Sequence, residues 1–391
     1  MTGSPLPPLA RKVRRAYLNR FDSEPEIIIM APGRINLIGE HTDYNLGYVL
    51  PGAVQYGVCF ALGPNVQNRH TWIAMDKRQE VVLSGAGVTQ QRGDWTDYLL
   101  GAWLAIGRQL PNPPLVNAVF SADLPEGAGL SSSSALTCGM LFGLQQMLGL
   151  SLERADIAWM AHQVEREFVG LQGGIMDQHA CMLGKAGHLL LLDCRDRSFE
   201  QIPFATEDMT LFLINTNVKH NLTETDYNTR ADECRQAVEI IAQHHPVESL
   251  RDVDEQQVDQ LSETLGPVLT RRVRFVLAEN RRVLQTIAFL GQQNWEAIGR
   301  LLQESHDGLQ TQYEVSCPEL DSLAQLTNAQ SWIHGARMMG GGFGGCVLCL
   351  AQRPPDEAFQ EQVISAYRER FGLAPTFIQV RLADGARVVV R

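Results

Sequence analysis

The sequence predicts an α+β protein of two domains, and three observations support this prediction. The chain has 391 residues, a length that suits two or three domains or one unusually large one. Its first half alternates strand-like runs with helix-like segments, and its second half is largely helical before two further strands. Apolar residues make up 45% of the chain and charged residues 20%, as in folded soluble proteins. We therefore expect mixed β-sheets packed with helices, in domains covering residues 1–195 and 196–391.

The individual elements follow from the spacing of apolar residues and from turn-forming residues. In the first half we expect an amphipathic helix within residues 1–21, strands over 26–31 and 116–122, a helix over 135–150 and a strand over 187–193. In the second half we expect a strand over 209–214, a largely helical region over 226–310 broken near Pro246 and Gly266-Pro267, a strand over 345–351, a helix over 356–371 and a strand over 375–382. We place the domain boundary between the strands over 187–193 and 209–214.

Three glycines shape the helix expected over 135–150. Gly149 ends it, because glycine readily adopts the left-handed backbone found at helix C-termini. Gly139 and Gly143 are four residues apart and so share one face of the helix. Since neither has a side chain, another element can approach that face closely.

Charge and composition argue against several classes of function. Asp and Glu number 44 against 33 Lys and Arg, a formal net charge of −11, so the net field repels nucleic acids and anionic membrane surfaces. A nucleotide would need local attraction from helix ends, backbone amides or a metal ion. Without a membrane-length apolar window or a secretion signal, we expect a cytoplasmic protein. The oligomeric state is not predicted.

The eight cysteines are too sparse for a disulfide framework, which agrees with a reducing compartment. Cys346 and Cys349 form a CxxC motif within an expected strand, where residues three apart face opposite sides. Neither a second CxxC nor a spaced His pair completes a metal set. We therefore interpret both cysteines as core residues.

The most informative motif is the serine loop, Leu124-Pro-Glu-Gly-Ala-Gly-Leu-Ser-Ser-Ser-Ser-Ala135, between an expected strand and helix. Gly127 and Gly129 permit backbone angles closed to other residues, and the serines add hydroxyl donors where the helix begins. The amides and dipole of the helix start favour an anion, so the loop is a candidate phosphate site. The alternative is a serine-capped helix after a glycine turn, but only one of the four serines can cap. The loop also lacks the Lys of a Walker A motif.

A second glycine cluster, Gly340-Gly-Gly-Phe-Gly-Gly345, contains a formal GxGxxG motif. In a dinucleotide-binding fold a strand precedes this motif and a helix follows it. Here a strand-like run follows. We therefore interpret the cluster as a glycine-rich turn or as a loop that folds over a ligand.

Two further segments carry polar side chains suited to a ligand. Within residues 31–45, Arg34 can bind an anion with both arms of its guanidinium group. The segment also contains Glu40, His41 and Asp43, for which three interpretations are open. They bind the hydroxyls of a polyol, they form a metal site, or they belong to a solvated turn. Because a third metal ligand at suitable spacing is missing, carbohydrate binding suits this cluster better. Asp177, which follows two glycines, is a helix cap, a turn residue or a catalytic base.

Together, these segments resemble the GHMP family of small-molecule kinases and, within it, the galactokinases. APGRINLIGEHTDYN resembles the galactokinase sugar motif, GAGLSSSSA the family's phosphate loop, GGIMDQ its catalytic segment, ARMMGGGFGGC its glycine-rich third motif and YEVSCPELD a further galactokinase run. The resemblance covers the chain from about residue 24 onwards. It implies a two-domain GHMP kinase fold with the active site in the cleft between the domains. Residues 1–195 would hold the sugar motif and phosphate loop, and residues 196–391 the third motif.

The resemblance implies ATP-dependent phosphorylation of the anomeric hydroxyl of α-D-galactose, the first committed step of the Leloir pathway, with Mg²⁺ as a cofactor. It implies that Asp177 is the catalytic aspartate and Arg34 its partner beside the transferred phosphoryl group. The binding residues that it implies are Glu40, His41, Asp43, Gly174 and Tyr227 for the sugar, Trp95, Gly127, Gly129, Ser131, Ser132 and Ser133 for ATP, and Ser133 and Glu165 for the metal.

The chemistry independently requires such residues, because phosphoryl transfer depends on positioning and on neutralising negative charge. Asp177 either accepts the hydroxyl proton or only orients the sugar. Two other functions stay open: a kinase for N-acetylgalactosamine, arabinose or galacturonate, and a non-catalytic sensor of galactose and ATP. The chain departs from common galactokinase patterns at Ser134-Ala135, at Met339, where many members have Thr, and at Phe275, where His is common.

Overall fold

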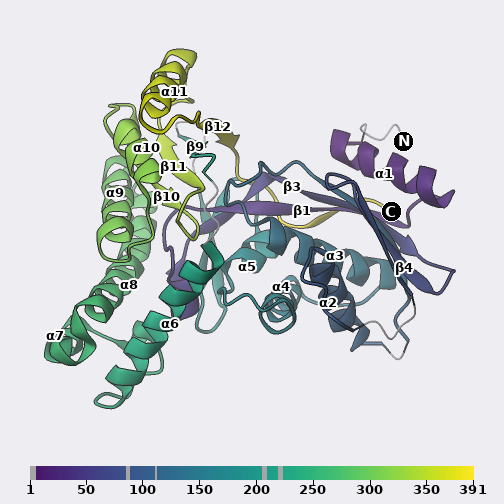
Figure 1. The fold of residues 1–391 in the computed structure, drawn as a ribbon, viewed down its shortest axis with the longest axis horizontal. Helices are drawn as coiled ribbons and strands as arrows, with labels where there is room; N and C mark the ends of the chain where they lie inside the picture. The colour runs from purple at the N-terminus through teal and green to yellow at the C-terminus, as the bar shows by residue number, and fades with distance from the viewer. Residues whose placement is uncertain (1–5, 85–88, 111, 205–208, 219–222) are drawn as a thin grey trace.

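The computed structural model describes residues 6–84, 89–110, 112–204, 209–218 and 223–391. A long mixed sheet with helices on both faces forms one part of the molecule, and an antiparallel sheet backed by helices forms another (Figure 1). The fold is thus α+β with mixed sheets, as predicted.

The long sheet has the strand order β13-β1-β3-β6-β4-β5, and its pairs are antiparallel apart from β4 with β6. Its strands are β1 (Ile27–Asn36), β3 (Pro51–Pro64), β4 (Arg69–Ala74), β5 (Gln79–Ser84), β6 (Val116–Ala122) and β13 (Arg387–Val390). Side chains alternate along β1, so Ile29 joins the core on one face while Ile28 and Met30 pack on the other. Helix α1 (Pro8–Phe21) covers the Ile28 face.

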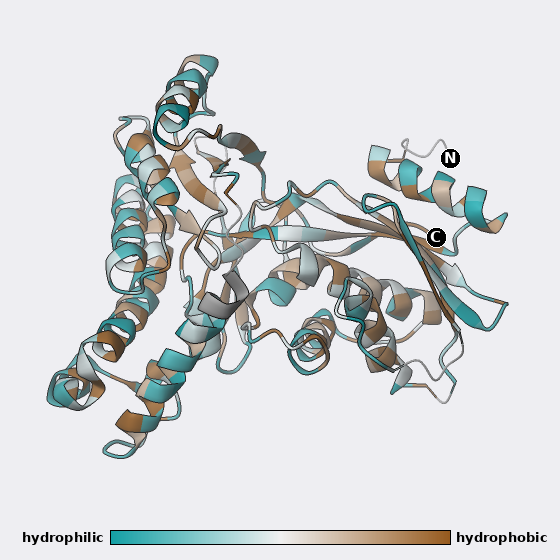
Figure 2. Ribbon diagram, in the orientation of Figure 1, coloured by the Kyte–Doolittle hydropathy of each residue, from teal (hydrophilic) through white to brown (hydrophobic). Residues whose placement is uncertain are grey.

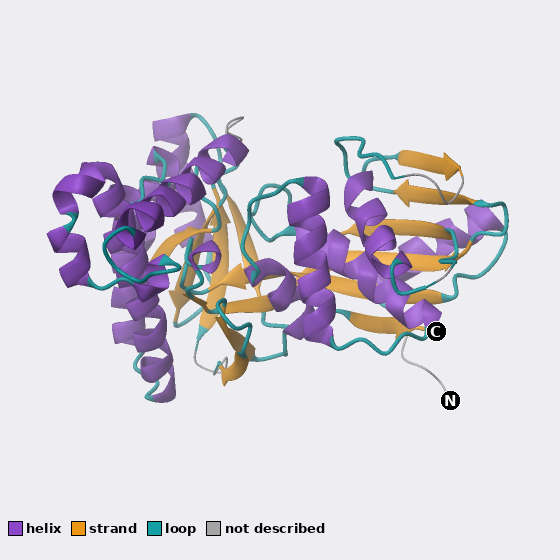
Figure 3. Cartoon of the chain, turned by 90° about the horizontal axis from the view of Figure 1, so that it is seen from below, coloured by secondary structure: helices purple, strands orange, loops and turns teal. Residues whose placement is uncertain are grey.

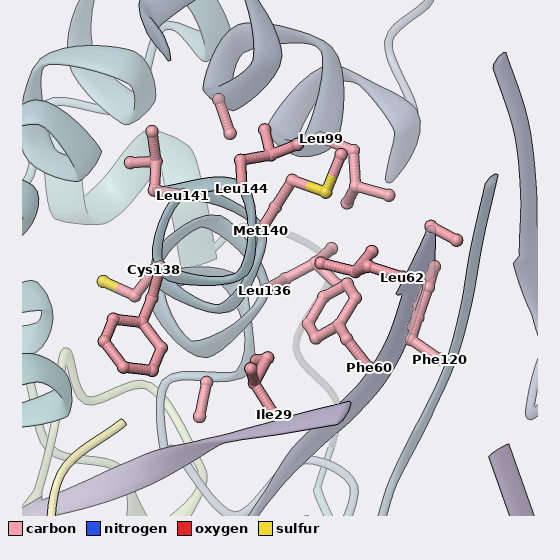
Figure 4. Packing of buried hydrophobic residues seen from close by; sticks show 14 of the residues in the cluster. Ile29, Phe60, Leu62, Leu99, Phe120, Leu136, Cys138, Met140, Leu141 and Leu144 are labelled. Atoms are coloured by element: carbon pink, nitrogen blue, oxygen red, sulfur yellow. The ribbon is translucent and has the colours of Figure 1, made fainter. Parts of the chain in front are cut away.

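The opposite face of the long sheet carries α2 (Thr96–Gly107), α3 (Ser132–Leu148), α4 (Arg154–Gln163) and α5 (Met176–Leu183). Figure 4 shows the core between α3 and the sheet, where Phe60 and Leu62 face the helix. A Cβ at Gly139 would lie 2.5 Å from Phe60, and one at Gly143 would overlap Leu62. Gly149 caps α3 with a φ of 64°. The predicted roles of these three glycines are confirmed.

The second sheet is antiparallel, with the order β10-β11-β9-β12. Its strands are β9 (Thr210–Asn215), β10 (Ile333–Met339), β11 (Cys346–Ala351) and β12 (Thr376–Val380). Cys346 and Cys349 lie on β11 in different core clusters, and both are buried free thiols. The prediction that they are core residues on opposite faces is confirmed. A third, short sheet joins β2 (Tyr48–Val49), β7 (His188–Asp193) and β8 (Phe199–Pro203).

The helices of the second half are α6 (Thr223–Ala242), α7 (Glu255–Gln260), α8 (Ser262–Gly291), α9 (Trp295–Thr311), α10 (Pro318–Asn328) and α11 (Glu357–Phe371). The predicted break at Gly266-Pro267 is present as a kink in α8, where Gly266 has a φ of 70°. Figure 2 shows that polar and apolar residues alternate along these helices. Within the described residues, no helix is both long and apolar enough to cross a membrane.

Helix α1 and the last strand, β13, lie at the same end of the long sheet (Figures 1 and 3). There β13 pairs with β1, so the last strand of the chain belongs to the sheet that the first strand begins. The division at 195/196 falls in the turn between the paired strands β7 and β8. This boundary stays a proposal for the domain organisation. Strands β8 and β13 follow it in the sequence but pair with β7 and β1, which precede it.

Helix α9 packs closely on β10 because glycines meet at the contact. A Cβ at Gly299 would overlap the backbone carbonyl of His334, and backbone cannot move aside cheaply. We predict that Gly299→Ala lowers the free energy of unfolding by about 1–3 kcal/mol, as overpacking does. Gly291→Ala, where a Cβ meets nothing within 4 Å, is the matched control and should leave it unchanged or slightly higher. Equal stabilities of the two variants in urea unfolding would contradict this explanation.

Candidate active site

An ion pair between Arg34 on β1 and Asp177 on α5 lies at the centre of the site. Nε and Nη2 of Arg34 donate to the two carboxylate oxygens of Asp177 at 2.7 and 3.0 Å. Nη1 donates to the carbonyl of Gly129, and the Arg34 backbone N–H donates to the carbonyl of Leu130 at 3.0 Å. The Arg34 side chain is 7% exposed and that of Asp177 25%. The pair therefore joins β1, the serine loop and α5, with the carboxylate on the more open side.

The serine loop wraps around this ion pair with a strongly bent backbone. Gly127, Gly129 and Ser131 have φ values of 66°, 65° and 62°. Ser131 stands at the N-cap of α3, but its side chain does not cap the helix, and its hydroxyl instead donates to Asp177. The interpretation as an ordinary serine-capped helix is therefore wrong. The first amides of α3 are left without a side-chain cap, an arrangement that can bind an anion.

Glu40 is held by the opposite wall of the site. Its Oε1 accepts from the backbone N–H of Gly340 at 2.7 Å and lies 3.3 Å from Nη2 of Arg337. Its Oε2 accepts from the side-chain amide of Asn36. Glu40 thus links the sugar motif to the glycine cluster, which forms the hairpin loop between β10 and β11. A strand and not a helix follows the cluster, so the expectation that it is not a dinucleotide motif is confirmed.

Arg337 on β10 is a site residue that the sequence reasoning missed. Its side chain is fully buried, and it donates to the carbonyls of Leu37 and Asn36 at 2.7 and 2.6 Å. These bonds fix the backbone just before Glu40. A signal was present, because an arginine within the apolar run Ala336-Arg-Met-Met339 must find partners in the core.

Asp43 lies close to the catalytic segment. A Cβ at Gly174 would overlap its carboxyl group, so glycine at 174 is what lets the two segments meet. Burial, together with the nearby negative charge of Asp177, raises the pKa of Asp43 to about 7. A protonated or strongly hydrogen-bonded carboxyl group at this position suits a ligand with several hydroxyls.

His41 and Tyr227 complete this side of the site. His41 has a φ of 63°, and its ring centroid lies 5.4 Å from that of Tyr227 on α6. Burial lowers the pKa of His41 to about 3, so the ring is neutral at physiological pH. The two rings thus form a largely apolar wall with polar edges.

Glu165 lies in the π-helical turn Val164–Val169 that continues α4. Its Oε2 accepts from the hydroxyl of Ser134 at 3.3 Å, and its Oε1 is buried with no hydrogen-bond partner among the described residues. Burial raises the pKa of Glu165 to about 7. No group of three or more His, Cys, Asp or Glu suited to a metal occurs in the described part of the chain. The unpaired oxygen nevertheless offers one ligand to a cation.

These residues surround a cavity of about 700 Å³. The predicted site residues that line it are Arg34, Glu40, His41, Asp43, Ser133, Glu165, Gly174, Asp177 and Tyr227. Lining residues that were not predicted include Asp94, Asp97, Tyr98, His162, Asn228 and Phe343.

Four predicted residues of the serine loop and Trp95 are placed differently. The cavity wall formed by the described residues includes Ser133 but not Gly127, Gly129, Ser131 or Ser132. Trp95 is packed in the core, with its ring 5.2 Å from that of Phe120 and its Nε1 donating to Gln79 at 2.7 Å. Its neighbours Asp94 and Tyr98 reach the cavity.

Family models match three parts of the chain. They are the galactokinase galactose-binding signature over residues 15–64, the GHMP kinase N-terminal domain over 97–185 and the GHMP kinase C-terminal domain over 286–372. A galactokinase of Thermotoga neapolitana is 36% identical over 92% of this chain and 99% of its own length. One of Canis lupus familiaris is 35% identical over 97% of each chain.

Solved structures give the same likeness. The crystal structure of Lactococcus lactis galactokinase complexed with galactose matches 96% of this chain and 99% of that chain, with a TM-score of 0.92 and 28% identity. A mevalonate kinase structure matches 92% of this chain and 100% of that chain, with a TM-score of 0.64 and 17% identity, which shows the fold alone.

The raised pKa of Asp43 predicts a pH dependence of stability. Because its folded-state pKa of about 7 exceeds the ordinary value of 3.8, the stability it contributes is full below about pH 4 and is lost as pH rises towards 7. The side chain of the Asp43→Asn variant cannot titrate. Without ligand, its free energy of unfolding should therefore rise relative to that of the parent by roughly 2 kcal/mol from pH 5 to pH 8, at about 1.4 kcal/mol per pH unit. Urea unfolding at both pH values measures this.

Asp356→Asn is the control for this measurement. The Phe359 backbone N–H lowers the pKa of Asp356, so its carboxyl group is ionised in both states throughout this pH range. Its stability relative to the parent should be the same at pH 5 and pH 8. A pH-independent difference for Asp43→Asn would show that Asp43 is not buried as described.

Proposed function

The chain belongs to the galactokinase family of the GHMP kinases, and from this premise we propose how its residues bind galactose and ATP in the cavity and transfer the phosphoryl group. Membership of this family makes the chain an ATP-dependent sugar kinase with galactokinase activity. The comparisons favour neither a kinase for a related sugar nor a sensor. The observation that carries the residue assignments is the Arg34–Asp177 pair, which connects the serine loop to the cavity.

Galactose occupies the side of the cavity formed by the sugar motif. Asp43 and His41 offer polar groups there, Gly174 leaves room beside Asp43, and the Tyr227 ring provides an apolar surface for the sugar face. Glu40 lines the same wall, but its oxygens already accept bonds from Asn36 and Gly340 and form an ion pair with Arg337. It therefore contributes mainly by holding the wall in place.

The phosphates of ATP bind along the serine loop. The left-handed backbone at Gly127 and Gly129 bends the loop sharply, as in other anion-binding loops. Ser132, Ser133 and the uncapped start of α3 add hydroxyl and amide donors. This local attraction acts against the net charge of −11. Trp95 would support the adenine pocket from behind, through the segment that carries Asp94 and Tyr98.

In the transfer step, the oxygen on C1 of galactose bonds to the γ-phosphorus, and the bond from that phosphorus to the bridging oxygen of ADP breaks. The hydroxyl proton leaves toward Asp177, either during the step or after it. Arg34 orients the Asp177 carboxylate through two bonds and lies beside the transferred group, where its charge offsets negative charge. The products are galactose 1-phosphate and ADP.

Ser133 and Glu165 fit a magnesium ion. Glu165 has a buried carboxylate oxygen without a partner among the described residues, and Ser133 lines the same cavity. Mg²⁺ is commonly bound by one or two protein oxygens together with phosphates and water, so a full protein cage is not needed. When bound, the ion would neutralise charge on the phosphates. Glu165 and Ser133 would hold it on the side of the serine loop.

We further propose a cytoplasmic location. All eight cysteines are free and buried, as expected of a protein folded in a reducing compartment.

A coupled ADP-release assay across a panel of monosaccharides tests the substrate. We expect galactose to stimulate ADP release most strongly and N-acetylgalactosamine, arabinose and galacturonate to stimulate it weakly. Removal of Mg²⁺ with a chelator should abolish the signal, and added Mg²⁺ should restore it. Absence of stimulation by any hexose would defeat the assignment of function.

Asp177→Asn tests the catalytic assignment. The amide cannot accept a proton as a carboxylate does, so turnover should fall at least ~100-fold, while ATP binding in a direct titration is retained. Asp123→Asn is the matched control outside the cavity, because Asp123 accepts from the backbone N–H of Gly57 at 2.7 Å. It should keep normal turnover. Unchanged turnover of Asp177→Asn would remove Asp177 from the catalytic set.

A further inference from the structure

A chain of hydrogen bonds runs from His41 away from the cavity. Nδ1 of His41 lies 2.8 Å from the hydroxyl of Tyr44, which lies 2.8 Å from the hydroxyl of Tyr313. That hydroxyl lies 3.1 Å from Sγ of Cys234, and the side-chain amide of Asn45 donates to the same sulfur at 3.6 Å. Tyr313 and Cys234 are buried, so these groups have little access to water as an alternative partner.

The other nitrogen of His41 lies at the cavity end of this chain. Nε2 is buried and has no hydrogen-bond partner of ordinary geometry among the described residues, although the backbone of Gly341 acts on the ring and both residues line the cavity. Its ring is held between those of Tyr313 and Tyr227, at centroid distances of 4.8 and 5.4 Å. Because a buried polar atom without a partner is costly, Nε2 is poised to bond a ligand in the cavity.

The hydrogens along the chain decide what kind of bond Nε2 can make. A neutral ring carries one N–H, and the low pKa of His41 keeps the ring neutral. If Cys234 donates to Tyr313, Tyr313 to Tyr44 and Tyr44 to Nδ1, every hydrogen of the chain has an acceptor and Nε2 carries the N–H. In the reverse direction Nδ1 carries the N–H, and the buried thiol hydrogen is left without an acceptor.

The surroundings of Cys234 favour the first direction. The cavity beside His41 holds charges of both signs, and the charges that act most strongly on its ring are the positive ones of Arg230 and Arg337, so the potential does not select the tautomer. At the other end of the chain, Asn45 already donates to the Cys234 sulfur, which leaves the thiol hydrogen free to be given to Tyr313.

We propose that Tyr44, Tyr313 and Cys234 are positioning residues that set the tautomer of His41, so that Nε2–H donates to a hydroxyl of the bound sugar other than the C1 hydroxyl. The sugar part of this inference rests on the proposed function. The three residues do not touch the reacting atoms. Their hydrogen bonds keep the proton on Nε2, so that His41 donates toward the cavity and favours sugars with an acceptor oxygen at that position.

The tautomer is measured directly by ¹⁵N NMR of the histidine-labelled full chain without sugar. We expect Nδ1 of His41 to give the shift of an unprotonated nitrogen and Nε2 that of an N–H. His41→Gln identifies the signal by its loss. An N–H on Nδ1 would overturn the proposal whatever the enzyme does with galactose.

Steady-state kinetics then test the effect on the sugar. Tyr44→Phe should raise the KM for galactose about 3- to 10-fold, the scale of one weakened hydrogen bond, with the KM for ATP unchanged. With the four galactoses that lack one hydroxyl at C2, C3, C4 or C6, the effect of Tyr44→Phe should vanish for one of them. Cys234→Ala should raise the KM for galactose, and Cys234→Ser, which keeps a donor, should restore it.

Tyr367→Phe is the matched control for a purely structural loss. The Tyr367 hydroxyl is also buried and donates to the carbonyl of Thr216 at 2.9 Å, but Tyr367 does not line the cavity. It should lower the melting temperature without changing either KM. If Tyr44→Phe raises the KM for ATP and the KM for every deoxygalactose by the same factor, the proposal is overturned. If NMR shows the N–H on Nε2 but the protein does not bind galactose, the sugar contact and the proposed function are both overturned. If NMR shows the N–H on Nδ1 and galactose turnover is normal, only the positioning role is overturned.

Discussion

The pairing of Arg34 with Asp177 is the constraint on which the rest of the site depends. A buried guanidinium group is tolerated only when its N–H groups find acceptors. The guanidinium group of Arg34 finds them on two elements, because Asp177 on α5 accepts two bonds and the serine loop supplies the carbonyl of Gly129. The Arg34 backbone N–H on β1 donates to the carbonyl of Leu130 in the same loop. The bent backbone of the loop is therefore tied to the position of the carboxylate. A candidate phosphate site and a candidate catalytic group are held together by one side chain.

A second set of buried charges connects the sugar motif to the second half of the chain. Arg337 on β10 donates to the backbone of residues 36 and 37 and pairs with Glu40. Glu279 on α8 is fully buried, accepts from the backbone N–H of Gly39 at 2.9 Å and pairs with Arg282. The motif thus has its conformation imposed from outside, by strands and helices distant in the sequence. This explains why an irregular segment with several polar side chains is almost completely buried.

The cavity gathers carboxyl groups at some cost to the folded state. Burial raises the pKa of both Asp43 and Glu165 to about 7, so each carboxylate is destabilised relative to water when no ligand is bound. Such an arrangement has little value for folding, but it is suited to binding a polyhydroxylated sugar and a cation with phosphates. The unpaired atoms of Glu165 and His41 fit the same explanation, since they face the cavity where ligands would pair with them.

The sequence by itself determined the helices and strands with strong periodicity, the role of Gly139, Gly143 and Gly149, the core position of the CxxC cysteines and the motifs of the family. These features depend on neighbours a few residues apart, which periodicity and turn chemistry express directly. The family resemblance implied that Arg34 is the partner of Asp177, but only the tertiary structure showed how the two charges meet. They are 143 residues apart, and no local pattern reports a contact formed by packing α5 against β1. For the same reason the burial of Arg337, the engagement of Glu40 and the placement of Trp95 in the core became visible only when the sheets and helices were assembled.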